Sequence, residues 1–360
     1  MNLRIPGPTP IPPNVMKASY RQMIGHRDSD FIVLYQDIEN GLKKVFQTNN
    51  DVLIFSGSGT GGMEATVVNL ISPGDRVLVP FCGSFGKRWA SIAKVFGAEV
   101  TEVEYPIGKS IDVENLIDSI NNAPPYKFLF VTHNETSTGV TNDISSLSLA
   151  LKALPGKRPI FAVDAISSLG AINLPTDNLD LDIVVSASQK ALMSPPGLSF
   201  VSVSPRAWDA IANSKCPRFY WDFRMAWDWN RKGGTPFTPS VSLMYALQEA
   251  LKMIFDEGLQ SVFMRHARLA EKLRKGITNI GLNLLAEDNY ASKTVTSVCL
   301  PLNWSMDQLI SDLKQKYRIA ISSGMANTNF RIAHMGYVKD EDIDQVIDAL
   351  KEIILEYGID

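Results

Sequence analysis

The sequence predicts an α/β protein whose larger part is a mostly parallel, doubly wound sheet and whose C-terminal part is a smaller α+β domain. Between about residues 50 and 205, short apolar runs of four to seven residues alternate with helical stretches, as buried parallel strands alternate with crossover helices. Beyond about residue 260, helical and strand-like segments follow one another without that alternation. The buried runs, in chain order, are DVLIF, RVLVP, EVTEV, KFLFVT, PIFAVD, DIVVSA and LSFVSVS.

The other elements follow from composition and helical periodicity. Five prolines lie within the first fifteen residues and indicate an N-terminal arm, residues 1–20. The aromatic-rich stretch 216–239 is expected to be irregular. We therefore expect a large domain at 21–260 and a small domain at 261–360. Apolar stripes predict helices around residues 243–254, 262–273 and 343–354, and SKTVTSVCLP, RIAISS and NFRIAHM have the composition of strands.

The composition argues against several classes of protein. The chain has 360 residues, an apolar fraction of 45% and a formal net charge of −3, so it can bury a full core and carries no electrostatic footprint for nucleic acid. Cys82, Cys216 and Cys299 are widely separated, which disfavours a disulfide framework or a zinc site and favours a reducing compartment. We find no signal peptide and no apolar run of membrane-spanning length. We therefore expect a cytoplasmic protein with no metal, membrane or nucleic-acid partner.

Four polar segments follow four of the predicted strands, at the points where those strands end. They are SGSGTGGMEA (56–65), HNETSTG (133–139), FAVDAISSLG (161–170) and SASQKALMSPPG (186–197). Parallel strands bring their carboxyl ends to one edge of a sheet, and ligands of open α/β sheets bind at that edge. We therefore expect the four segments to surround one crevice.

The glycine-rich segment has three possible explanations. A turn of small residues that begins a helix lets backbone N–H groups approach an anion, which favours a phosphate site. Gly57, Gly59 and Gly62 also match G-x-G-x-x-G, which would indicate a dinucleotide site. That interpretation is disfavoured because the next strand ends in Pro80 and Phe81, where a dinucleotide fold has an acidic residue. The third explanation is an ordinary glycine-rich turn.

Two charged residues stand at the ends of other strands. Asp164 either caps a following helix or presents a carboxylate at the functional edge of the sheet. Lys190 lies between two strands that enter a core, so we expect it in a cleft, where desolvation lowers the pKa of the amine and favours a Schiff base. The segment HNETSTG is either a polar turn or a further part of the crevice. A phosphate site, a carboxylate and a lysine together are what pyridoxal 5′-phosphate requires.

On these motifs the chain resembles the class V aminotransferases, which are fold type I pyridoxal-phosphate enzymes. It is most similar to their alanine–glyoxylate and serine–pyruvate (serine–glyoxylate) group. The most specific match is SQKAL-x-x-PPG, with Asp164 placed 26 positions before Lys190. The resemblance covers nearly the whole chain, through PGPTPIPP, IGHR (24–27), SGSGTGGMEA, SFGKRW (84–89), HNETSTG, VDAISSLG, TPFTPSVSLMYAL (235–247) and FRIAHMG (330–336).

The resemblance implies a role for each candidate residue. Lys190 would form a Schiff base with the cofactor and move a proton at the substrate α-carbon, and Asp164 would pair with the protonated ring nitrogen. Arg331 would bind the substrate carboxylate through two parallel hydrogen bonds. The remaining implied contacts are Ser58, Gly59, Thr60 and Gln189 at the phosphate, Phe85 stacked on the ring, Thr136 hydrogen-bonded to it, and Thr238 at the phosphate of the neighbouring subunit. The last contact implies a homodimer with its active site at the subunit interface.

The chain departs from the family pattern at two positions. Phe85 stands where many relatives have Trp, and Thr235 stands where some relatives have a Tyr three residues before the phosphate-binding Thr. The aromatic stretch 219–229 has no assigned role. It either packs at the subunit contact or forms a wall of the substrate pocket.

The expected reaction moves an amino group between alanine, serine or glycine and glyoxylate or pyruvate, by a ping-pong mechanism. One arginine for one carboxylate favours these donors over aspartate and glutamate. The nearest alternative is a pyridoxal-phosphate lyase or a cysteine desulfurase. A desulfurase needs a cysteine on a mobile loop, whereas the loop 322–329 has none and Cys299 lies in a predicted strand. A nicotinamide-dependent dehydrogenase is the alternative of a different class, and it leaves Lys190 and Asp164 unexplained.

Overall fold

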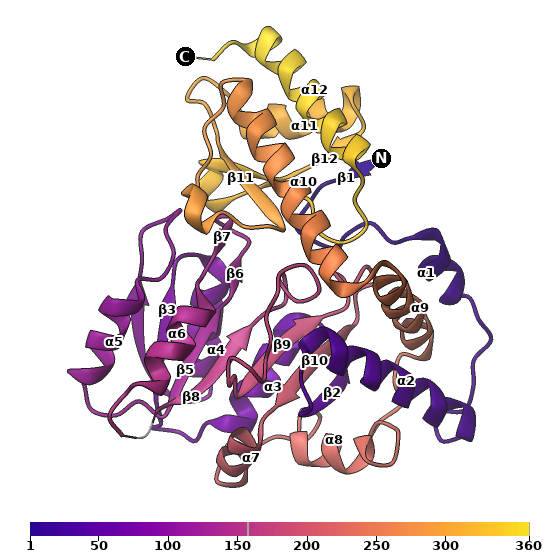
Figure 1. The fold of residues 1–360 in the computed structure, drawn as a ribbon, viewed down its shortest axis with the longest axis vertical. Helices are drawn as coiled ribbons and strands as arrows, with labels where there is room; N and C mark the ends of the chain where they lie inside the picture. The colour runs from indigo at the N-terminus through magenta and orange to yellow at the C-terminus, as the bar shows by residue number, and fades with distance from the viewer. Residues whose placement is uncertain (157, 360) are drawn as a thin grey trace.

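The central sheet of the computed structural model has seven strands in the order β2-β10-β9-β8-β5-β3-β4 (Figure 1). The structure describes residues 1–156 and 158–359. Within this sheet β10 runs antiparallel to both of its neighbours and the other pairings between adjacent strands are parallel, which confirms the predicted fold class. The strands are β2 (Asp51–Ser56), β3 (Arg76–Phe81), β4 (Glu99–Glu104), β5 (Phe128–Thr132), β8 (Ile160–Asp164), β9 (Ile183–Ala187) and β10 (Leu198–Val203).

Both faces of the sheet are buried along its inner strands, which explains why those strands are apolar runs without polar alternation. The prediction of a buried run was wrong for EVTEV, because β4 is the edge strand and its residues are exposed or half-buried. In β5, Phe128 and Phe130 enter one hydrophobic cluster, whereas Leu129 and Val131 enter another on the opposite face. This alternation is the two-residue period of an extended strand. The sheet is therefore the middle layer of three.

Helices cover the two faces in separate groups. Buried side chains of α3 (Gly59–Leu70), α4 (Ser84–Val95), α7 (Pro205–Ala212) and α8 (Phe223–Asn230) join the first cluster. Those of α2 (Ser29–Phe46), α5 (Val113–Asn121), α6 (Ile144–Lys152) and α9 (Val241–Glu257) join the second. A Ser or Asp side chain accepts a backbone N–H at the start of α3, α5, α6, α7 and α8, which explains where these helices begin.

The C-terminal part is a smaller α+β layer with its own hydrophobic cluster (orange to yellow in Figure 1). Its antiparallel sheet has the order β11-β14-β13. The elements are α10 (Leu259–Asn279), β11 (Val295–Cys299), α11 (Met306–Lys316), β12 (Ile319–Ala320), β13 (Ser322–Ser323), β14 (Asn329–Ala333) and α12 (Asp340–Tyr357). The C-terminal part also contains the 3₁₀ turns Asp288–Tyr290 and Met325–Asn327. Short elements elsewhere are α1 (Pro13–Ala18), β6 (Asn134–Glu135) and β7 (Val140–Thr141).

The beginning of the chain joins this C-terminal layer. The two-residue strand β1 (Asn2–Leu3) pairs in parallel with β12. Arg4 continues the contact, because its N–H donates to the Ala320 carbonyl (2.7 Å) and its carbonyl accepts from the Ala333 N–H (2.7 Å). The chain then leads away from the small domain, and the Pro6 carbonyl reaches Lys190.

One helix was missed in the stretch expected to be irregular. Helix α8 lies inside 216–239 and begins after Asp222, whose side chain accepts the Arg224 N–H (2.8 Å). It buries Phe223 and Ala226 against the sheet. The helix has eight residues and four aromatic or amide side chains of weak helical propensity, so tertiary packing rather than local preference stabilises it.

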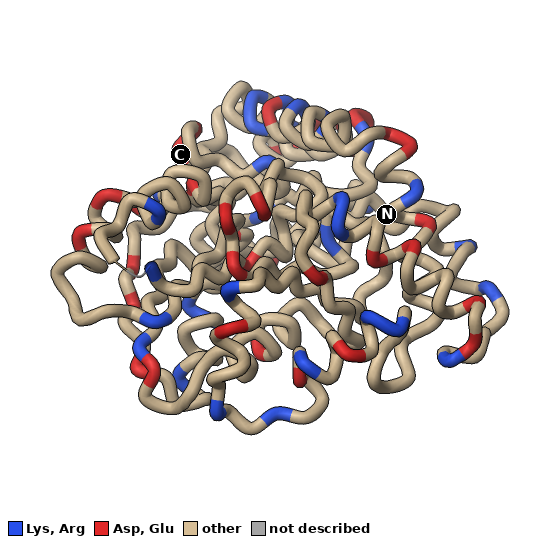
Figure 2. Tube along the Cα trace, turned by 60° about the horizontal axis from the view of Figure 1, so that its bottom comes forward, with Lys and Arg blue, Asp and Glu red and all other residues tan. Residues whose placement is uncertain are grey.

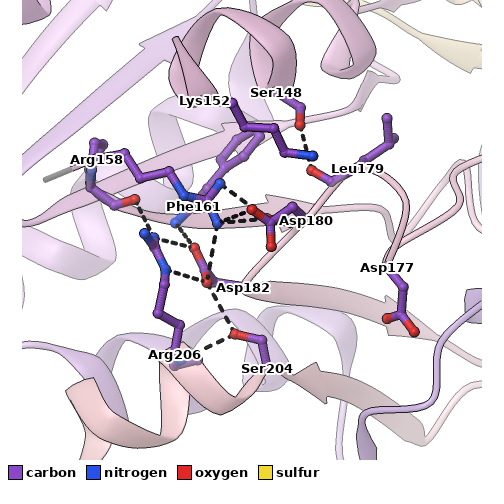
Figure 3. Close-up of polar contacts among 12 residues, drawn as sticks. Ser148, Lys152, Arg158, Phe161, Asp177, Leu179, Asp180, Asp182, Ser204 and Arg206 are labelled. Atoms are coloured by element: carbon purple, nitrogen blue, oxygen red, sulfur yellow. Dashed lines mark hydrogen bonds and ion pairs between the residues drawn. The ribbon is translucent and has the colours of Figure 1, made fainter. Parts of the chain in front are cut away.

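A polar network lies at the opposite edge of the sheet from the four polar segments (Figure 3). Asp182 directly precedes β9 and forms two hydrogen bonds with the Arg206 guanidinium (2.9 and 2.7 Å). Its carboxylate also accepts the Phe161 N–H (2.8 Å) and the Ser204 hydroxyl (3.1 Å). This buried carboxylate therefore joins two strands and α7, far along both strands from their carboxyl ends.

Basic and acidic residues are interspersed along the chain trace (Figure 2). Among the helices of residues 1–156 and 158–359, none combines the length and the hydropathy that a membrane span needs.

Candidate active site

The four polar segments meet at the carboxyl edge of the central sheet. The first and fourth are joined by the Gly57 N–H, which donates to the Gly197 carbonyl (2.8 Å). The second and third are joined by the His133 N–H, which donates to the Asp164 carbonyl (2.9 Å). The segments therefore lie together at one edge of the sheet, as the strand ends predicted, and the charges of Asp164 and Lys190 act on each other there.

The turn between β2 and α3 is tightly packed and needs its glycines. Ser58 precedes α3, and its hydroxyl accepts the Gly61 N–H (3.2 Å). A Cβ on Gly57 or Gly61 would lie 2.8 or 2.9 Å from the ring of Trp221, and one on Gly59 would lie 2.7 Å from a neighbouring side chain. Since Ser58 takes the Gly61 N–H, the N–H groups of Gly59 and Thr60 are those at the start of α3 to which an anion would bind.

A cation and an aromatic ring stand beside this turn. Phe85 is the second residue of α4 and is half-buried. The Arg88 guanidinium lies 4.7 Å from the centre of the Phe85 ring and donates to the Thr60 hydroxyl (3.1 Å). Thr60 and Phe85, which come from different motifs, are thus linked through Arg88.

Asp164 ends β8 and is 3% exposed. Its Oδ1 accepts the Ile166 N–H (2.9 Å), and a turn rather than a helix follows it, so it is not a helix cap. Burial raises the pKa of Asp164 to about 7, although the Ile166 N–H and the charges of Lys190 and Arg88 lower it. A cation placed beside this carboxylate would restore its ionised form at neutral pH.

Lys190 lies three residues beyond β9, between β9 and β10. Its Nζ donates to the Pro6 carbonyl (2.6 Å), and a Cβ on Gly7 would lie 2.6 Å from the same atom, so a side chain at position 7 would displace the amine. Burial lowers the pKa of Lys190 to about 8; Asp164 opposes that shift, and Arg331 adds to it. The amine is therefore half neutral near pH 8, where an ordinary lysine is fully charged.

Arg331 reaches the same crevice from the small domain. It lies in β14, and its Nε and Nη2 donate to the Ser323 carbonyl (2.9 and 2.7 Å). Nη1 donates to the carbonyl of the buried Thr136 (3.3 Å), which belongs to HNETSTG. Burial lowers the pKa of Arg331, and the nearby Glu135 opposes this shift. The guanidinium is thus held between the two domains.

Thr238 is placed apart from these groups. Its side chain is exposed, and it lies with Tyr220 and Phe237 around a small cavity beside the end of β2. The rings of Tyr220 and Phe237 are stacked with centroids 5.1 Å apart. The Thr238 side chain is therefore open to solvent in the single chain.

Comparison with known proteins identifies the family. The profile described as "Aminotransferase class-V" matches residues 2–346. The chain belongs to the class V aminotransferases. This class V aminotransferase is 40% identical to the soluble hydrogenase 42 kDa subunit of Anabaena cylindrica, over 99% of this chain and 94% of that protein. It is 35% identical to the L-aspartate–glyoxylate aminotransferase of Paracoccus denitrificans, over 99% and 91%.

The fold of this class V aminotransferase is also found in solved structures. The alanine–glyoxylate aminotransferase of Nostoc sp. superimposes with a TM-score of 0.93 at 31% identity, covering 98% of this chain and 94% of that one. The protein is an aminotransferase, and its cofactor is pyridoxal 5′-phosphate.

The residues of the crevice fit this cofactor. The glycine turn leaves the start of α3 open for a phosphate, and the Gln189 Oε1 is buried with no hydrogen-bond partner among the described residues. The buried Asp164 carboxylate suits a cationic ring nitrogen, and the Lys190 amine is already shifted toward its neutral, nucleophilic form. Each requirement of the cofactor therefore has a residue of matching chemistry.

Several residues of the class V aminotransferase site were not predicted from the sequence. Arg88 and Glu135 stand in motifs that were recognised, yet no role was assigned to either of them. Trp221 lies against the glycine turn of its own chain, a contact that was not predicted for the aromatic stretch. Pro6 lies in the proline-rich arm, and nothing in its composition signals a contact with Lys190.

Proposed function

We propose that this aminotransferase moves an amino group between a small amino acid, namely alanine, serine or glycine, and glyoxylate or pyruvate, by a ping-pong mechanism. The observation that carries the proposal is the Arg331 guanidinium, which is held between Ser323 and Thr136 beside the lysine and the carboxylate of the crevice. A planar guanidinium binds a carboxylate through two parallel hydrogen bonds, and every amino acid and 2-oxo acid carries that carboxylate.

The chain's own residues divide the work as follows. Lys190 holds the cofactor through its amine and then moves the proton that leaves or joins the substrate α-carbon. Asp164 stabilises positive charge on the ring nitrogen, since its buried carboxylate is ionised when a cation lies beside it. The bound cofactor supplies an acceptor for the electrons released at the α-carbon. Phe85 and Thr136 orient the ring, and Ser58, Gly59, Thr60 and Gln189 hold the phosphate.

We infer the preference for a small donor from the partners of the two arginines near Lys190. In this proposal Arg331 exchanges its carbonyl partners for the α-carboxylate, whereas Arg88 keeps Thr60 and the Phe85 ring. A side-chain carboxylate would therefore enter the crevice without a partner. The Nostoc relative is named for alanine, which agrees, whereas the Paracoccus relative is named for L-aspartate, so the donor has to be tested.

A donor panel provides that test. The holoenzyme is mixed with single amino acids, and the loss of its yellow colour is followed in each half-reaction. We expect alanine, serine or glycine to react fastest. A panel in which aspartate or glutamate is best would refute the small-donor proposal and would point to Arg88 as the second carboxylate site. Failure of all amino acids would refute the proposed class of donor.

A desulfurase is not favoured by the surroundings of its only candidate thiol in the small domain. Cys299 is the last residue of β11, and burial raises its pKa. The thiol is therefore protonated at neutral pH and is a poor nucleophile.

We infer that the active unit is a homodimer in which Thr238 serves the partner's phosphate site. Phe219 is 70% and Tyr220 43% exposed, so aromatic surface surrounds the exposed Thr238. Surface of this kind is typical of protein contacts. We further propose the domain limits 1–20, 21–260 and 261–360 and a cytoplasmic location.

Mixed subunits test the role of Thr238. Thr238→Ala removes a hydrogen bond to a charged group, so we expect cofactor affinity to fall by about 10-fold or more. A hybrid of one Thr238→Ala subunit and one Lys190→Ala subunit has one site with both residues intact, and this site should bind cofactor as tightly as the wild type. If no site in the hybrid binds the cofactor as tightly as the wild type, Thr238 acts within its own chain.

Arg331→Lys should weaken every substrate together. A lysine keeps the positive charge but lacks the two parallel N–H donors of the guanidinium. Losing a desolvated charge-assisted pair costs roughly 2–5 kcal/mol, so kcat/KM should fall about 30-fold or more for donors and acceptors. The matched control is Arg206→Lys, which removes the paired bonds to Asp182 at the far edge of the sheet. An unchanged kcat/KM in Arg331→Lys would remove the arginine from substrate binding.

A further inference from the structure

Glu135 is a buried carboxylate that the reaction described above does not use. It is 1% exposed and lies in β6, directly before Thr136. Among the described residues it forms no ion pair with a lysine or arginine, and burial raises its pKa. A carboxylate this deep in a protein is costly unless hydrogen bonds replace its water.

Four hydrogen bonds converge on this carboxylate. Oε2 accepts the backbone N–H groups of Phe85 (2.9 Å) and Gly86 (3.2 Å) at the start of α4. Oε1 accepts the Ser137 N–H (3.1 Å) and the Ser137 hydroxyl (2.5 Å). All four partners donate, so both oxygens must accept. The carboxylate also faces the positive end of the α4 dipole.

The neighbouring motif is shaped to admit this side chain. A Cβ on Gly83 would lie 2.5 Å from the Glu135 Cγ and 2.4 Å from the Ser137 hydroxyl, so the position before α4 has to be glycine. The Ser84 N–H donates to the same hydroxyl (3.0 Å). The segments GSFG and ETS therefore interlock.

The same short segment holds the small domain on its other side. The Thr136 carbonyl accepts from Arg331 (3.3 Å), and the Ser137 carbonyl accepts from the side chain of the buried Asn329 (3.3 Å). Residues 135–137 thus connect the start of α4, where Phe85 lies, with β14, where Arg331 lies.

We propose that Glu135 is a positioning residue that fixes the ring-stacking Phe85 and the carboxylate-binding Arg331 relative to each other. The inference rests on the proposed function of those two residues. Glutamine has almost the same shape but one acceptor oxygen, so its NH₂ group would face backbone N–H donors at one of the two ends. At least one buried N–H would lose its partner, and the segment that carries the Thr136 carbonyl would lose its anchor.

Kinetics of Glu135→Gln holoenzyme provide the test. We expect KM to rise about 10-fold for both the amino acid and the 2-oxo acid, because Arg331 would bind the substrate carboxylate less tightly. We expect kcat to change by less than about 3-fold, because Lys190, which moves the proton, is not displaced. Ser137→Ala, which removes one of the four bonds, should shift KM in the same direction by about 3-fold. Asp182→Asn is the matched control, since it also converts a buried, four-bonded carboxylate to an amide and should leave KM unchanged.

Hydrogen exchange gives a readout that does not depend on activity. The amides of Phe85 and Gly86 should exchange about 10-fold or more faster in Glu135→Gln than in the wild type, and Asp182→Asn should leave them protected. Unchanged exchange or unchanged KM in a folded Glu135→Gln protein would overturn the inference, as would an equal KM rise in Asp182→Asn. A wild-type enzyme inactive toward all amino acids would instead refute the proposed function, while the exchange result would still show whether Glu135 fixes α4.

Discussion

Lys190→Ala should yield a folded protein with no measurable turnover. The amine both holds the cofactor and moves the α-proton, so its removal takes away covalent and acid–base catalysis together, and we expect the rate to fall by at least about 10⁴-fold. The visible absorbance of the covalently held cofactor should disappear with it. The measurement is a single-turnover half-reaction with alanine, followed by absorbance.

The surroundings of Lys190 suggest that its loss will be tolerated by the fold. The side chain forms one hydrogen bond, to the Pro6 carbonyl, and its burial disfavours the charged amine. The matched control is Lys127→Ala, which removes a lysine paired with Asp75 (2.8 Å) on the surface and should retain activity. Substantial turnover in folded Lys190→Ala would exclude it as the catalytic amine.

Asp164→Asn should lower the rate of α-proton removal by about 10²–10³-fold, the usual effect of deleting one preorganised charge or donor from a water-excluded site. Asparagine can still accept the Ile166 N–H that Asp164 accepts at 2.9 Å, so the turn after β8 survives and only the charge is lost. The measurement is the primary isotope effect and rate of the half-reaction with α-deuterated alanine.

Comparison of Asp164→Asn with the wild type distinguishes two roles of Asp164, namely accepting the Ile166 N–H and carrying a negative charge. If the residue only shapes the turn, Asp164→Asn should behave as the wild type, whereas a role in holding charge on the ring nitrogen predicts the full loss. A rate within about 3-fold of the wild type would assign Asp164 to the turn alone.

The positions of Asp164 and Lys190 at strand ends were predictable from the sequence, because they depend on the local pattern of apolar residues. Asp164 is the last residue of β8, and Lys190 follows β9, as the apolar runs before them indicated. Arg331 was expected in a strand facing the crevice, and β14 places it there. Each of these positions follows from a two-residue or 3.6-residue period within a short window.

The rest depends on contacts between distant segments, which no local period encodes. The Pro6 carbonyl meets Lys190, Trp221 packs on Gly57 and Gly61, and Glu135 accepts the Phe85 N–H. A buried glutamate in a polar motif is indistinguishable in sequence from one in a solvated turn. Only the three-dimensional arrangement shows that its hydrogen bonds end on α4.

The pairing of β1 with β12 has a consequence for the order in which the enzyme is made. Asn2 and Leu3 leave the ribosome long before Ile319 and Ala320, on the order of tens of seconds earlier at ordinary elongation rates. Until then residues 2–4 have no strand to join, and the Pro6 carbonyl that meets Lys190 is anchored on one side only, through Thr9. The large sheet can form during synthesis, but the surroundings of the lysine are completed only after β12 and β14 have emerged. The nascent chain therefore acquires its scaffold early and its reactive centre last.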